Sequence, residues 1–155
     1  VRPVDDDFHA RFSATARRYR YRILNRLVRS ALWRHRAWWV HQDLDHRRMH
    51  DAAQVLLGEH DFSAFRAAGC QASNAIREVT NIRVERDGDW VLLDITANAF
   101  LQHMVRNITG TLVAIGRGDA EGRDGRRGLT NSRHYVRRTE RDIRLIDMAS
   151  RPGVG

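Results

Sequence analysis

Residues 76–100, IREVTNIRVERDGDWVLLDITANAF, contain two runs rich in β-branched and other apolar residues, separated by Asp87-Gly88. An Asp-Gly dipeptide between two such runs favours the tight turn of a β-hairpin. We therefore predict two antiparallel strands joined at Asp87-Gly88. This hairpin commits the centre of the chain to an antiparallel sheet.

A further strand is predicted in TARRYRYRILN, residues 15–25. Tyr19, Tyr21 and Ile23 alternate with arginines at positions 18, 20 and 22. Because side chains of a strand point alternately to its two faces, this strand has an aromatic face and a basic face. The two faces imply two different neighbours.

A first helix is predicted in DLDHRRMHDAAQVLLGEH, residues 43–60. Asp43 or Asp45 can cap its N-terminus, and Gly58 can end it. Apolar residues follow the spacing of one helix face. They are Met49, Ala52, Ala53, Leu56 and Leu57.

A second helix is predicted after Asn98, which we expect to cap it. Its apolar stripe should face the core and comprises Leu101, Met104, Val105, Ile108, Leu112 and Ile115. Arg106 falls beside this stripe, with Gln102 and Val113, and Gly110 lies one turn further along. A guanidinium stays charged, so Arg106 needs a carboxylate, a phosphate or water. Strands and helices together predict an α+β fold.

The charge of the chain points to an anionic partner. All 27 basic residues are Arg, and the net charge is +8. This balance favours RNA or DNA over a membrane surface. A genome rich in G and C also favours Arg codons over Lys codons, but this bias does not explain the positive net charge.

Membrane and secretory signals are not found in this sequence. No apolar run reaches the length of a membrane span, and the first residues carry an acidic cluster where a signal peptide would be apolar. A single cysteine fits a reducing compartment. We expect a cytoplasmic protein with no membrane partner.

The length of 155 residues fits about one domain. The composition changes after Gly118, where Gly, Arg and Asp dominate. We therefore divide the chain into a domain at residues 1–118 and a divergent, irregular basic tail at 119–155.

The general catalytic signatures in this sequence do not identify an active site. His46 and His50 stand one helical turn apart, but there is no convincing third ligand, so we expect a solvated helix face and no metal. Cys70 in AAGCQAS has no basic partner nearby in sequence, and we interpret it as a buried structural thiol.

Three blocks carry a resemblance to a known family. In order, they are DDFHARFSATARRYRYRI, LLGEHDFSAFRAAGCQA and ITANAFLQHMVRNITGTLVAIGRG. Together they resemble the C-terminal half of the tRNA pseudouridine synthase A family. The resemblance implies an α+β fold with an antiparallel or mixed sheet and helices packed on one face. It also implies an enzyme that isomerises uridine to pseudouridine in the anticodon arm of tRNA, without a cofactor and as a homodimer.

The resemblance assigns site residues. Tyr19 in RRYRY matches the active-site tyrosine of the family, and Arg106 in MVRN matches its active-site arginine. The nucleophilic aspartate of the family lies in an RTDAGVHA-like segment, which this sequence does not contain. Asp5, Asp6 and Asp7 belong to the block that follows it and are not the nucleophile. The chain is therefore expected to be a fragment that is inactive alone.

The chemistry gives each residue a role. A carboxylate in a shielded pocket tends to be neutral, and Arg106 would keep it ionised and aimed. Tyr19 would pack against the base and supply a hydroxyl for proton transfer. Five arginines are expected to contact phosphates. They are Arg17, Arg18, Arg20, Arg22 and Arg66.

Two other functions stay open at this point. One is a non-catalytic RNA-binding remnant, which the missing aspartate favours. The other is a small structural or dimerisation domain whose charge reflects genomic bias.

Overall fold

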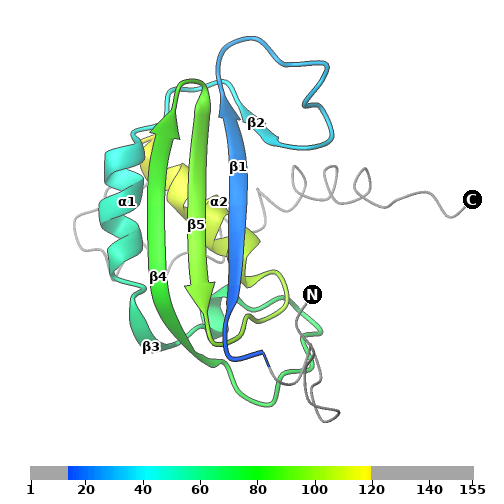
Figure 1. Cartoon of the computed structure of the whole chain (residues 1–155), viewed down its shortest axis with the longest axis vertical. Helices are drawn as coiled ribbons and strands as arrows, with labels where there is room; N and C mark the ends of the chain where they lie inside the picture. Colours follow the sequence, from blue (N-terminus) through cyan, green and yellow to red (C-terminus); the bar gives the residue numbers. More distant parts are fainter. Residues whose placement is uncertain (1–13, 120–155) are drawn as a thin grey trace, which may run out of the picture.

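A computed structural model describes residues 14–119 as a five-stranded sheet with two helices and one short 3-10 helix (Figure 1). The strand order is β2-β1-β5-β4-β3. Neighbouring strands are antiparallel except β1 and β2, so the sheet is mixed and the predicted α+β class is confirmed. In chain order, the elements are β1 (Arg17–Asn25), β2 (Trp38–Val40), α1 (His46–Gln54), β3 (Gly58–Asp61), η1 (Ser63–Phe65), β4 (Ile76–Asp87), β5 (Trp90–Ala97) and α2 (Met104–Gly116).

The hairpin of β4 and β5 is confirmed, but its turn lies one residue later than predicted. Asp87 pairs with Trp90, so the two turn residues are Gly88 and Asp89. Gly88 has φ +56°, a left-handed conformation that favours glycine. The glycine therefore takes the first turn position, and Asp87 ends the strand.

Strand β1 has the two predicted faces. Ile23 is fully buried and Tyr21 half-buried, whereas Arg18, Arg20 and Arg22 are exposed on the other face. β1 pairs with β5 from Arg17 to Leu24, but β2 joins it only from Ile23 onward. Within residues 14–119, the earlier part of β1 is therefore an open edge of the sheet.

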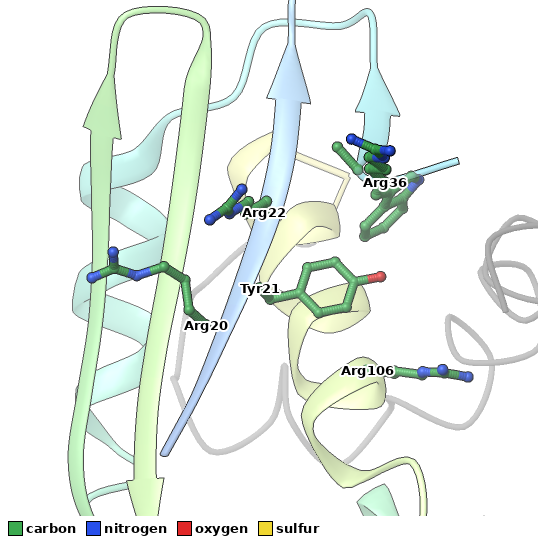
Figure 2. Close-up of a pocket in the computed structure, with 7 residues that line it drawn as sticks. Arg20, Tyr21, Arg22, Arg36 and Arg106 are labelled. Carbon is green, nitrogen blue, oxygen red and sulfur yellow. The ribbon is translucent and has the colours of Figure 1, made fainter. Parts of the chain in front are cut away.

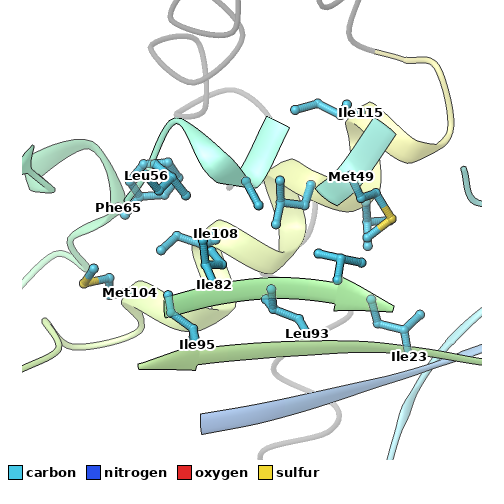
Figure 3. Close-up of a cluster of buried hydrophobic side chains, with 14 of the residues drawn as sticks. Ile23, Met49, Leu56, Phe65, Ile82, Leu93, Ile95, Met104, Ile108 and Ile115 are labelled. Atoms are coloured by element: carbon cyan, nitrogen blue, oxygen red, sulfur yellow. The ribbon is translucent and has the colours of Figure 1, made fainter. Parts of the chain in front are cut away.

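Both helices pack against one face of the sheet, where their apolar side chains meet those of the strands (Figure 3). Asp45 is the N-cap of α1, because its carboxylate accepts the backbone N–H groups of Arg47 and Arg48. The helix ends at Gln54, before the predicted stop at Gly58. The buried apolar residues of the two helices include Met49, Ala53, Met104, Ile108, Leu112 and Ile115.

The predicted cap of the second helix is wrong. Asn98 accepts the backbone N–H groups of Glu78 and Ala99, so its side chain closes the end of the β4–β5 hairpin. Helix α2 begins at Met104, after His103 in a left-handed conformation. The apolar stripe is confirmed, since five of its residues are buried and Val105 packs partly against the core.

A buried polar network joins the ends of several elements. The Asn25 amide nitrogen donates to the carbonyls of Val40 (3.0 Å) and Gln42 (2.7 Å). Its oxygen accepts the Arg86 guanidinium (2.7 Å) and the Leu44 backbone N–H (3.3 Å). Asn25 is 7% exposed, and these hydrogen bonds offset the cost of removing its polar side chain from water.

The contact of α1 with the end of α2 gives a first prediction. A Cβ at Gly116 would lie 2.7 Å from the Met49 sulfur, which is fully buried. We expect Gly116→Ala to lower the free energy of unfolding by about 1–3 kcal/mol through overpacking, measured by urea denaturation. In a Met49→Ala background, the same change should cost nothing, because its methyl group fills vacated space. An equal cost in both backgrounds would contradict this contact.

Candidate functional site

A pocket of about 410 Å³ lies at the open edge of β1 (Figure 2). Its lining comes from β1, from the segment that enters β2, and from α2. The pocket exists because β2 covers only the last three residues of β1 and leaves the preceding edge uncovered. The lining residues are Arg20, Tyr21, Arg22, Arg36, Ala37, Trp38 and Arg106.

Arg106 lines this pocket from the first turn of α2. It is half-buried and lies beside the apolar stripe, as predicted. In Figure 2 its side chain and that of Tyr21 project to the same side, past the edge of β1. Gly110, one turn further along, is buried in the helix packing. The structure thus places a guanidinium and an aromatic ring in the lining of one cavity.

The two tyrosines of β1 differ in their surroundings. Tyr21 is half-buried, and its ring meets Trp38 edge-on at 6.5 Å between centroids. Tyr19, on the same face, is 49% exposed and meets Phe100 edge-on at 5.1 Å. Tyr19 is not among the residues lining the pocket, whereas Tyr21 is. The sequence pattern alone did not single out Tyr21, although the alternation in RRYRYR places it on the same face as Tyr19.

On the outer face of the sheet, two arginines of β1 contact one carboxylate. Arg20 donates to both oxygens of Asp94 at 2.8 Å, and Arg18 approaches the same carboxylate at 3.5 Å. The Asp94 side chain is only 10% exposed. The hydrogen bond from Arg20 holds the pKa of Asp94 below its ordinary value and raises the pKa of Arg20. Arg20 is therefore tied to the protein in this structure.

The other predicted phosphate contacts lie in different settings. Arg17 begins β1 half-buried, and Arg22 is exposed at the pocket. Arg66 donates to the carbonyls of Cys70 (2.5 Å) and Ala72 (2.8 Å), so it holds the loop after η1 together. The contact of Arg66 with a phosphate stays a prediction, but its structural role is clear.

Cys70 is half-buried, whereas the sequence predicts a buried thiol. Backbone N–H groups of Ala72 and Gln102 lower the pKa of the thiol, with a smaller contribution from Arg66. The sequence predicts no basic partner for Cys70, but the loop after η1 folds back and brings the Arg66 guanidinium to the Cys70 carbonyl.

His46 and His50 of α1 are both half-buried, whereas the sequence predicts a solvated helix face. His50 Nδ1 accepts the Val84 backbone N–H (3.3 Å), and Gln54 donates to the Ile82 carbonyl (3.2 Å). These side chains satisfy the edge of β4 beyond the reach of β3. Residues 14–119 contain no group of three or more His, Cys, Asp or Glu that could hold a metal ion. No helix in the same range is long and apolar enough to cross a membrane.

Comparisons with known proteins agree with the resemblance of the three blocks. A family model described as tRNA pseudouridine synthase matches residues 52–147, which extends past Gly118. The chain is 60% identical over 116 residues to the tRNA pseudouridine synthase A of Pseudoalteromonas atlantica, covering 75% of this chain and 44% of that protein. It is 60% identical over 119 residues to that of Hydrogenovibrio crunogenus, covering 77% and 45%. The chain thus spans a little under half the length of these relatives.

The Asp94 cluster gives a second prediction. Asp94→Asn should lower the free energy of unfolding at neutral pH by about 1 kcal/mol, because a charged, two-point hydrogen bond to a half-exposed Arg20 is lost. The pKa of Asp94 is lowered on folding, so this contribution is complete above pH about 4 and declines as the pH falls further. Urea denaturation of both proteins at several pH values measures the difference.

A matched control exists on the same face. Glu85 pairs with Arg83, and the Glu85 side chain is half-exposed like that of Arg20. Glu85→Gln is expected to change stability by less than about 0.5 kcal/mol at any pH. A stability loss in Asp94→Asn that is the same at acid and neutral pH would contradict the role given to the carboxylate.

Proposed function

Because the chain belongs to the tRNA pseudouridine synthase family, we propose that it forms part of the active site with which the whole protein isomerises uridine to pseudouridine in the anticodon arm of tRNA. The observation that carries this proposal is the pocket at the β1 edge, which Arg106 lines together with Tyr21 from the aromatic face of β1. The family motifs RRYRY and MVRN, far apart in sequence, contribute to the same region.

The reaction needs three kinds of group. The N-glycosidic bond of uridine must break, the uracil must turn, and the ring must rejoin the ribose through carbon. A positioned carboxylate, a shielded pocket and a group that handles the proton at the new bond meet these needs. The family resemblance places the carboxylate in a segment that residues 14–119 do not contain. We therefore assign to this part of the chain the positioning of carboxylate and base.

Arg106 is proposed as the partner of that carboxylate. Its guanidinium has the fork geometry that holds a carboxylate ionised and oriented. Its half-buried position at a cavity wall supports this role, because screening by water is reduced there. Tyr19 is proposed to pack against the uracil and to assist proton transfer, and its exposed ring, held from one side by Phe100, supports this.

Binding of tRNA is proposed to use the basic residues of β1. Arg18 and Arg22 are exposed and can contact phosphates directly. The Arg20 guanidinium is bound to the Asp94 carboxylate, so fewer of its donors can reach a phosphate. From the family resemblance we also infer a homodimer that works in the cytoplasm, with no cofactor and no membrane partner. The family activity on tRNA supports that location.

Binding to tRNA is the third prediction. The chain should bind an unmodified tRNA transcript, with an affinity that falls steeply as salt rises, because each phosphate contact adds roughly 0.7–0.9 to the log–log slope. Fluorescence anisotropy over a salt series measures this. An affinity that does not change with salt would contradict a phosphate-binding surface.

The role of Arg106 gives the fourth prediction. In a chimera, the matched segment of this chain replaces its counterpart in the Pseudoalteromonas atlantica relative. Arg106→Ala should nearly abolish pseudouridine formation and leave tRNA affinity almost unchanged, because the lost contact positions the nucleophile. Arg106→Lys should also fail, since an ammonium cannot replace a two-point fork.

Arg47→Ala, at an exposed position on α1, is the matched control and should keep full activity. Circular dichroism checks that every variant folds. Near-normal turnover in Arg106→Ala would show that the residue transfer from the family is wrong.

A further inference from the structure

The loop between β1 and β2, residues 26–37, exposes an unusual amount of apolar surface. Leu27 is 81% exposed, Val28 72% and Leu32 85%, the highest values among the large hydrophobic residues of the described part. In Figure 1 this loop projects from the end of the sheet. Exposed aliphatic side chains gathered on one loop indicate a surface that is covered by a partner.

The same loop is strongly basic. Residues 26–37 contain four arginines, one histidine and no acidic residue. Arg26 pairs with Asp89 at 3.5 Å, whereas Arg29, Arg34 and Arg36 have no carboxylate partner within residues 14–119. Among the described residues, three arginines of the loop are therefore not paired with a carboxylate.

This charge selects the partner. A symmetric contact with a second copy would bring identical basic loops together in a chain of net charge +8, and like charges at an interface oppose association. A nucleic acid offers both phosphates for the arginines and base faces for the aliphatic side chains. The loop therefore fits RNA better than another copy of this chain.

Contacts with Trp39 of β2 and Trp90 of β5 hold the loop in place. The Trp39 indole N–H donates to the Arg26 carbonyl (2.9 Å), and the Arg29 guanidinium lies over the Trp39 ring at 5.7 Å. Trp33 meets Trp90 edge-on at 5.1 Å, which fixes the middle of the loop to the start of β5. Since these contacts order the loop in advance, less conformational entropy is lost when a ligand binds.

The loop continues into the pocket wall. Arg36 and Ala37 at its end, together with Trp38, line the same cavity as Arg106 (Figure 2). A base that enters such a cavity must leave its stack, and the faces of its neighbours are then exposed. Apolar side chains next to the pocket can cover those faces.

We propose that the β1–β2 loop binds the RNA strand beside the nucleotide in the pocket. Its arginines contact phosphates, and Leu27, Val28 and Leu32 pack on the flanking bases and riboses. This inference rests on the proposed function. It adds a contact surface beyond the arginines of β1.

The test compares three double variants for binding to an unmodified tRNA transcript over a salt series. Arg34→Ala/Arg36→Ala should weaken binding roughly ten- to thirty-fold at about 0.1 M salt and lower the log–log slope by about 1.5, because two phosphate contacts are lost. Leu27→Ser/Leu32→Ser should weaken binding roughly ten-fold with an unchanged slope, because base contacts release no counterions.

The control is Arg47→Ala/Arg48→Ala, which removes the same charge from exposed positions on α1 and should bind within about two-fold of the unsubstituted chain. All substituted side chains are exposed, and thermal unfolding checks that each variant folds. Sedimentation velocity of every protein reports its oligomeric state.

The outcomes separate the two proposals. If the unsubstituted chain binds tRNA and both loop variants bind equally well, the loop proposal is wrong and the proposed function stands. If the leucine variant changes a dimer into a monomer and the arginine variant binds tRNA normally, the loop is a subunit interface instead. If the unsubstituted chain does not bind tRNA, both proposals fail.

Discussion

The buried carboxamide of Asn25 determines how the edge of this sheet is built. Its two donors hold the carbonyls of Val40 and Gln42, and its acceptor holds Leu44 and Arg86, so β2 and the approach to α1 are fixed to the end of β1. A buried amide must be satisfied in this way, because each missing hydrogen bond costs about 1–3 kcal/mol. Since β2 is attached only there, the preceding edge of β1 stays open within the described residues, and the pocket forms beside it.

The arginines of residues 14–119 do not form one uniform basic surface. Arg20 is held by Asp94, Arg66 by loop carbonyls, and Arg86 by Asn25 and Leu44. These guanidinium groups stabilise the sheet and its loops, because their donors are used within the protein. Other guanidinium groups of the described residues are exposed, among them those of Arg22 on β1, of Arg34 and Arg36 on the β1–β2 loop, and of Arg47 and Arg48 on α1. The net charge of +8 therefore does not by itself say which arginines can contact RNA.

The proposed site and the proposed RNA-binding loop share residues of the pocket lining. The stretch from Arg36 to Trp38 ends the loop and lines the pocket, while Arg106 reaches the same cavity from α2. An RNA strand that lies along the loop would thus deliver a nucleotide to the pocket without a rearrangement of the sheet. In the two proposals, the loop orients the tRNA and Arg106 acts in the chemistry that follows.

The sequence by itself determined the features that depend on local periodicity: the β4–β5 hairpin, the two faces of β1, the Asp45 cap and the apolar stripe of α2. Each of these features depends on residues that are close together in the sequence. Tertiary structure alone decided that Arg20 meets Asp94, 74 residues away, and that Asn98 closes the hairpin instead of capping a helix. It also brought Tyr21 and Arg36 to the cavity with Arg106. These contacts depend on strand register and on packing between elements, which local side-chain patterns do not specify.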